Sequence, residues 1–123
     1  MLRLRPLDVS VPIFKQLASE QSPVVLINIF HVSEEDISGV IKAWTADASW
    51  MKQQSGFIST QLHQGIAGSN VLMNYAIWES VTHFRNAFNH PDFKRSLEAY
   101  PSSTVASPHL FKRMSIPNVC VGP

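Results

Sequence analysis

Cysteine is almost missing from this chain of 123 residues, which contains only Cys120. A single cysteine cannot form an intramolecular disulfide or supply the clustered thiolates of a zinc or iron–sulfur site. The histidines lack the i, i+4 or short strand spacing of a metal-ligand pair, so we expect no metal. No apolar run approaches the roughly 20 residues that span a bilayer, and none near the N-terminus has signal-peptide length. We therefore expect a cytoplasmic protein that does not insert into a membrane.

The sequence also lacks an excess of charge of either sign. Ten Lys and Arg residues stand against nine Asp and Glu residues, a formal net charge of +1, with no run of like charges. Binding to nucleic acid requires a basic stripe that neutralises phosphates, so we expect no DNA or RNA partner.

Apolar residues, in contrast, are plentiful: they make up 45% of the chain and include three Trp, seven Phe and two Tyr. This length and composition predict a single folded domain. We place it at residues 23–116, between an N-terminal extension of residues 1–22 and a tail of residues 117–123. In the extension we expect one short helical turn around Phe14–Leu17 and no catalytic role.

The domain is predicted to begin with a buried strand and an amphipathic helix. Residues Val24–Val32 are largely β-branched and apolar at both parities, which is typical of a strand buried on both faces. Ser33 is a candidate N-cap before three acidic residues, which favour a helix start. A helix of about five turns follows and ends near Ser55-Gly56. Its apolar stripe consists of Ile37, Val40, Ile41, Trp44, Ala48 and Met51.

A hairpin and an interrupted helix come next. Residues 57–64 and 71–78 read as two strands joined by a glycine-containing turn at residues 65–70. Glu79-Ser80 caps a helix, which breaks at Asn89-His90 because Pro91 disfavours helical geometry in the residue before it. The last strand is predicted at residues 109–114. The inward-facing residues of the helical segments are expected to be Val81, Phe84, Phe88, Phe93, Leu97 and Tyr100.

The element order is therefore β-α-β-β-α-β, which predicts an α+β domain of ferredoxin-like topology with a four-stranded antiparallel sheet. Both helices cover the same face of such a sheet. Because the first and third strands are apolar on both sides, the other face also needs cover. An identical sheet is the economical solution, so we expect a homodimer packed sheet to sheet.

Several motifs in residues 23–115 resemble those of the antibiotic-biosynthesis-monooxygenase family, whose members form dimeric α+β barrels. They are Gly56-Phe57, His63, the string Asn74-Tyr75-Ala76-Ile77-Trp78-Glu79-Ser80, and Asn89-His90-Pro91-Asp92-Phe93. The string is similar to that of the anthrone- and quinol-oxidising members. The resemblance implies that Asn74 and Trp78 bind or oxidise the substrate, and that no cofactor is needed.

The sequence departs from the family's patterns at two places, and these departures limit which activities of the family the resemblance implies. An active-site tyrosine of the anthrone-oxidising members corresponds to Phe84 here, which has no hydroxyl. The haem-degrading members use an Asn, a Trp and an axial His; Asn28 matches the first, but Ala87 and Leu97 occupy the other two positions. Without an imidazole there, haem iron would lack its axial ligand.

The predicted site combines polar and aromatic side chains. Asn74 and Trp78 share strand parity and so point to one face, while Asn28 lies in mid-strand and Phe84 and Phe88 lie on the inner helix face. His63 is the candidate base, since an imidazole titrates near neutral pH. For each residue a structural role remains the alternative: a cross-strand hydrogen bond for the two amides, core packing for Trp78, and a surface or hydrogen-bonded role for His63.

The resulting hypothesis is a cofactor-independent monooxygenase that oxidises a small aromatic substrate, such as a quinol, anthrone or polyphenol, with O2. Two alternatives stay open on the same fold. One is a non-catalytic ligand-binding or stress-related dimer, and the other is a polyketide-type cyclase or isomerase that needs a base but no oxygen.

Overall fold

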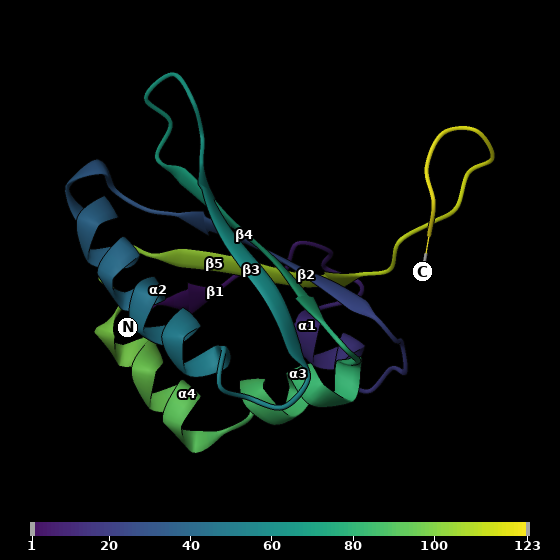
Figure 1. The fold of residues 1–123 in the computed structure, drawn as a ribbon. Helices are drawn as coiled ribbons and strands as arrows, with labels where there is room; N and C mark the ends of the chain where they lie inside the picture. Colours follow the sequence, from purple (N-terminus) through teal and green to yellow (C-terminus); the bar gives the residue numbers. More distant parts are fainter. Residues whose placement is uncertain (1, 123) are drawn as a thin grey trace.

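The computed structural model describes residues 2–122, which form a five-stranded sheet with helices packed against it (Figure 1). The elements, in chain order, are β1 (Arg3–Leu4), α1 (Ile13–Gln16), β2 (Val24–His31), the 3-10 turn η1 (Glu34–Asp36), α2 (Ile37–Met51), β3 (Phe57–Gln64), β4 (Val71–Trp78), α3 (Val81–Phe88), α4 (Pro91–Ser96), the 3-10 turn η2 (Leu97–Ala99) and β5 (Val105–Phe111). No helix among these residues is both long and apolar enough to cross a bilayer.

The sheet confirms the predicted ferredoxin-like class and extends it by one strand. Its order is β1-β5-β2-β4-β3, and the last four of these strands are mutually antiparallel. The N-terminal extension adds β1, which runs parallel to β5 through Arg3 and Leu4. The sheet is therefore mixed and five-stranded, rather than the four-stranded antiparallel sheet expected from the sequence.

The predicted last strand was placed too late in the chain. It runs over Val105–Phe111 rather than residues 109–114. Pro108 obscures this strand in the sequence, because proline cannot donate to a strand ladder. Proline is tolerated where its missing N–H faces an open edge, and β1 pairs with β5 only at Val105 and Ala106.

The helix starts follow local capping as predicted in two cases out of three, whereas α2 ends at Met51, before the predicted stop at Ser55-Gly56. The Ser80 hydroxyl accepts a hydrogen bond from the His83 N–H (3.1 Å) at the start of α3. His90 caps α4, and Pro91 is its first residue, which confirms the predicted break. Ser33, however, makes no capping hydrogen bond with its side chain, and a 3-10 turn precedes α2.

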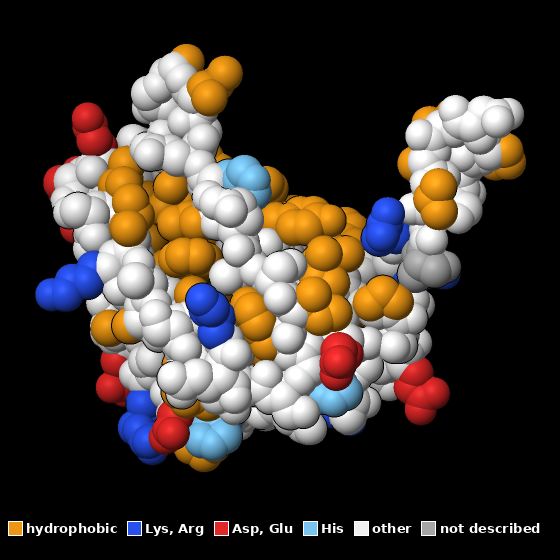
Figure 2. Space-filling view, in the orientation of Figure 1, with side chains coloured by type: hydrophobic (Ala, Val, Ile, Leu, Met, Phe, Trp, Pro, Cys, Tyr) orange, Lys and Arg blue, Asp and Glu red, His pale blue; other side chains and the backbone are white. Residues whose placement is uncertain are grey.

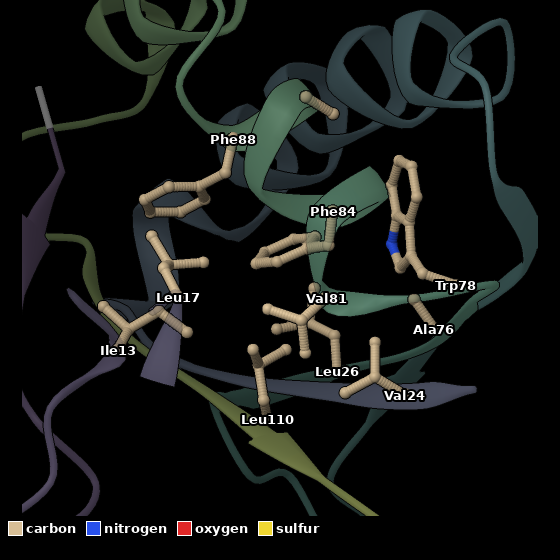
Figure 3. Packing of buried hydrophobic residues seen from close by; sticks show 11 residues of the cluster. Ile13, Leu17, Val24, Leu26, Ala76, Trp78, Val81, Phe84, Phe88 and Leu110 are labelled. Atoms are coloured by element: carbon tan, nitrogen blue, oxygen red, sulfur yellow. The ribbon is translucent and has the colours of Figure 1, made fainter. Parts of the chain in front are cut away.

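The helices α2, α3 and α4 lie on one side of the sheet and bury two hydrophobic clusters. The first cluster joins α1 and α3 to the sheet, with Leu17, Trp78 and Phe84 packed together (Figure 3). The second joins α2 and η2 to the other end of the sheet through Val40, Phe30 and Tyr100. A space between these two clusters is where the polar side chains of the sheet gather.

The opposite face of the sheet is apolar along its central strands, β2 and β4. Because side chains alternate along a strand, Ile27 and Ile29 of β2 and Met73, Tyr75 and Ile77 of β4 point away from the helices. Tyr75 is 38% exposed at the middle of this face. Figure 2 shows hydrophobic side chains gathered in the hollow between the raised β3–β4 hairpin and the C-terminal arm.

Candidate active site

A cavity of about 80 Å³ lies between the sheet and its helices. This is several times the roughly 15 Å³ that one water molecule needs. Its wall is mostly aliphatic and aromatic, and it includes side chains from all five strands and from α2, α3 and α4. Five polar side chains interrupt that wall: Asn28, Asp47, Thr60, Asn74 and Tyr100. A few polar groups in an otherwise apolar enclosure are typical of a small-molecule site.

Two of the polar groups are amides on neighbouring strands. Asn28 of β2 and Asn74 of β4 are direct cross-strand partners, so their side chains emerge side by side on the helix face. The Thr60 hydroxyl on β3 donates to Asn74 Oδ1 at 2.5 Å, which leaves the Asn74 Nδ2 group available as a donor. Asn28 Oδ1 is buried and has no hydrogen-bond partner among residues 2–122.

An unpaired buried oxygen is unfavourable, because its desolvation costs about 1–3 kcal/mol. The Asn28 oxygen is therefore a group that a ligand hydroxyl could satisfy. Together the two amides present one acceptor and one donor to the same cavity. For Asn74 the cross-strand hydrogen bond considered as its structural role is present, because Thr60 lies on the neighbouring strand β3, whereas Asn28 Oδ1 makes no such bond.

Aromatic rings form one side of the cavity. The Trp78 ring packs edge-on against Phe57 (centroids 5.4 Å apart) and Phe84 (5.7 Å), and Phe84 packs against Phe88 (5.4 Å). Phe57 reaches this face because a bulge shifts the β3 register before Ser59. The indole nitrogen of Trp78 lies on the side of its ring that faces Phe84 (Figure 3). Flat aromatic walls of this kind suit a flat aromatic ligand.

Five of the six residues predicted for the site thus line one cavity: Asn28, Asn74, Trp78, Phe84 and Phe88. His63 does not. In the β3–β4 register His63 is opposite Met73 and Leu62 is opposite Asn74, so the His63 imidazole points to the other face of the sheet and is exposed. The sequence prediction considered which strand borders the motif but not which face His63 occupies, and it was wrong about this placement. No group of three or more His, Cys, Asp or Glu side chains within residues 2–122 is placed to share a metal ion.

The structure also places in the cavity a carboxylate that the sequence prediction missed. Asp47 lies on α2, is 6% exposed, and lines the cavity together with Tyr100. Burial raises the pKa of the Asp47 carboxyl above its ordinary 3.8, and hydrogen bonding by Ser96 and Tyr100 offsets part of that rise. Burial and the neighbouring Asp47 charge raise the pKa of the Tyr100 hydroxyl above its ordinary 10.0. Tyr100 is therefore a protonated donor at neutral pH.

A signal for Asp47 was present in the sequence. The expected apolar stripe of α2 continues through positions 40, 44 and 48, and position 47 falls on the same side of a helix. In the structure the buried face consists of Val40, Ala43 and Asp47, while Ile41 is 38% exposed. An acidic residue inside an apolar stripe is a candidate functional residue, since charge is seldom buried without a partner or a function.

The raised pKa of Asp47 predicts how stability depends on pH. The folded protein binds this proton more tightly than the unfolded chain, so the free energy of unfolding falls as the pH rises from about 3.8 through the folded-state pKa. Asp47→Asn should abolish this loss. Urea denaturation across a pH series should find the variant more stable than the wild type at pH 7 and about equal to it at pH 3. A variant less stable at neutral pH would mean that the carboxylate is stabilised as an ion.

The fold resembles those of two solved structures. A solved structure of SnoaB, a cofactor-independent oxygenase from Streptomyces nogalater, superposes with a TM-score of 0.70 at 23% identity, over 80% of this chain and 100% of its own. A candidate monooxygenase from Shewanella loihica PV-4 is 34% identical, with a TM-score of 0.67, over 77% of this chain and 97% of its own. No curated protein matches the chain.

The family comparison agrees with these structures. The family model described as "Antibiotic biosynthesis monooxygenase" matches residues 23–99, from the start of β2 to the end of η2. The matched segment carries Asn28, Asp47, Asn74 and Trp78, while Leu2 and Leu4 of the cavity wall lie before it. The chain belongs to the antibiotic biosynthesis monooxygenase family.

Proposed function

We propose that the protein is a cofactor-independent monooxygenase that oxidises a small aromatic substrate, a quinol, anthrone or polyphenol, with O2. Membership of the family supports a monooxygenase-type role. The fold shared with SnoaB is consistent with oxygenase chemistry that needs no cofactor. The observation that carries the proposal is the pairing of Asn28 and Asn74 across β2 and β4, inside a cavity with aromatic walls.

The two amides have complementary parts in this proposal. A phenolic hydroxyl of the substrate donates to the unpaired Asn28 Oδ1, which satisfies that buried oxygen. The Asn74 Nδ2 group, oriented by the hydrogen bond from Thr60, donates to the oxygen on which negative charge develops. Trp78, Phe84 and Phe88 pack against the aromatic rings of the substrate.

The chemistry depends on a substrate that is itself easily oxidised. Ground-state O2 is a triplet and reacts slowly with closed-shell molecules, but a deprotonated anthrone or quinol gives it an electron readily. For an anthrone, loss of a proton gives the anion, and one-electron transfer to O2 gives a substrate radical and superoxide. Their recombination forms a C–O bond, protonation gives a hydroperoxide, and cleavage of the O–O bond with loss of water leaves a carbonyl.

Substitutions at the amide and the indole test this proposal. Asn74→Ala and Trp78→Phe should each reduce O2 uptake with a panel of quinols and anthrones, by about 100-fold for Asn74→Ala, as when an oxyanion donor is removed. The control is Asn86→Ala, since Asn86 is exposed on α3. Thermal denaturation followed by circular dichroism should show that every variant is as stable as the wild type.

Two other outcomes would contradict the oxygenase proposal, and each would indicate one of the two alternative functions. Product formation from the same substrates under strict anaerobiosis would indicate a cyclase or isomerase. Saturable binding of the panel without turnover in air would indicate a ligand-binding protein.

The apolar outer face of the sheet supports a further part of the proposal, a homodimer packed sheet to sheet. Ile27, Ile29, Met73 and Ile77 are only partly covered on this face, and Tyr75 is exposed at its centre. A second copy of the chain would bury these side chains by a two-fold symmetric contact. Members of the family are commonly dimeric.

A further inference from the structure

The proposed oxidation begins with removal of a proton, and the cavity offers very few groups that can accept one. Of the residues that line it, within the described part of the chain, only Asp47 and Tyr100 titrate. Tyr100 holds its proton too tightly to serve as a base. None of the histidines borders the cavity, and His63 faces the other side of the sheet. Asp47 is therefore the base that remains.

The surroundings of Asp47 hold its carboxylate in one place. It projects from α2 into the cavity beside Tyr100, the residue after η2, whose hydroxyl hydrogen-bonds it. The Tyr100 ring is itself fixed, because it stacks on Phe30 with centroids 6.1 Å apart and planes 9° from parallel. A donor held in this way positions the carboxylate for proton transfer.

Within residues 2–122, no Lys, Arg or His side chain forms an ion pair with this carboxylate. The charged residues of α4, which packs against α2, are exposed and do not line the cavity; they are Asp92, Lys94 and Arg95, of which Asp92 and Arg95 pair with each other. Lys42 of α2, Glu98 of η2, and Glu34 and Glu35 of η1 are exposed as well, and Asp36 accepts from the Ser103 hydroxyl. A buried carboxylate without a counter-ion disfavours folding, and such groups cluster at functional sites.

We propose that Asp47 is the proton acceptor of the oxidation site and that Tyr100 is its positioning residue. The assignment rests on the proposed function. Asp47 takes the proton from the substrate carbon or hydroxyl, and the electron pair of the broken C–H or O–H bond stays on the substrate. After O2 has added, the Asp47 carboxylic acid returns this proton to the peroxide oxygen. The carboxylate is thus restored at the end of each turnover.

Asp47→Asn is the direct test, because asparagine has nearly the same shape but cannot accept the proton. With the best substrate of the quinol and anthrone panel, kcat/KM should fall about 100- to 10,000-fold, the usual contribution of a general base. The dissociation constant of the substrate should change less than threefold. Asp8→Asn is the matched control, since Asp8 is exposed in the N-terminal extension. An Asp47→Asn variant with near wild-type kcat/KM would overturn the assignment and leave the oxygenase proposal intact.

Tyr100→Phe separates positioning from a purely structural role. The Tyr100 hydrogen bond lowers the pKa of Asp47, so its removal should move the acid limb of the kcat/KM profile to higher pH. A structural defect alone would lower kcat/KM at every pH without moving this limb. An unmoved limb would overturn the positioning role of Tyr100.

An anaerobic measurement distinguishes failure of this assignment from failure of the oxygenase proposal. With anthrone as the probe and O2 excluded, the wild type should produce the absorbance of the anthrone anion, and Asp47→Asn should not. If this Asp47-dependent anion forms but O2 is not consumed, the base assignment stands and the oxygenase proposal fails. If the anion forms equally in both proteins, or in neither, the base assignment fails.

Discussion

Replacing Phe84 by alanine is expected to lower the free energy of unfolding by about 3–5 kcal/mol, the usual cost of removing a buried aromatic ring. The Phe84 ring is 1% exposed and lies between Trp78 and Phe88, so its loss leaves a void that two other large rings must border. The ring also lines the cavity, so its removal enlarges that empty space. Urea denaturation at one fixed protein concentration measures the change.

The matched control for this substitution is Phe14→Ala. Phe14 of α1 is 62% exposed, although its edge contacts Phe88 at a centroid distance of 6.1 Å. Its removal should cost less than about 1 kcal/mol, as for most surface substitutions. Equal losses for the two variants would contradict the packing described for the α3 side of the cavity.

Tyr75→Glu is expected to convert a dimer into a monomer at micromolar concentration. The proposed sheet-to-sheet contact would bury this carboxylate among the apolar side chains of β2 and β4, and none of the strands β2 to β5 carries a Lys or Arg to pair with it. A buried, unpaired charge at an interface costs about 2–5 kcal/mol, which weakens a dimer at least tenfold. Light scattering coupled to gel filtration gives the molar mass directly.

Thr82→Glu is the control for Tyr75→Glu, because Thr82 is exposed on α3, on the helix side of the sheet. It adds the same charge and should leave the molar mass unchanged. A wild-type protein that is a stable monomer at the same concentration would disprove the proposed dimer, and with it the explanation given for the apolar outer face.

Hydrophobic periodicity predicted the central elements well, because their burial is regular. The runs over β2 and β4 are apolar at both parities, and these are the two strands in the middle of the antiparallel part of the sheet. The α3 inner face of Val81, Phe84 and Phe88 is buried as expected. The hydrophobic pattern within each of these segments is enough to predict a helix or a strand, whatever the segment packs against.

The ends of the chain were harder to predict, because their structure depends on tertiary contacts. β1 consists of two residues, Arg3 and Leu4, which have no periodicity and pair only because β5 offers an edge. In β5, Pro108 breaks the local pattern of a strand that the register with β2 nevertheless stabilises. Local propensity is a weak guide where a neighbouring strand supplies the hydrogen bonds.

The sequence predicted most of the residues that line the candidate site, but it did not predict the acidic side chain among them. Strand parity correctly grouped Asn74 with Trp78, but the same rule was not applied to His63, which it places on the other face. Asp47 was missed because a helix face cannot be located to within one residue from sequence, and the buried face of α2 lies to one side of the expected stripe. The carboxylate became recognisable only when Tyr100, 53 positions further along the chain, was seen beside the same cavity.

The short parallel strand β1, at the start of the chain, affects the shape of the cavity. Leu2 and Leu4 form part of the cavity wall, next to Phe30 and Ala106, yet both precede the segment shared with the family. Relatives that keep every amide and aromatic group of the shared segment need not have these two leucines. Part of the cavity wall, and so part of the cavity's shape, is therefore formed by residues outside the segment that the family model matches.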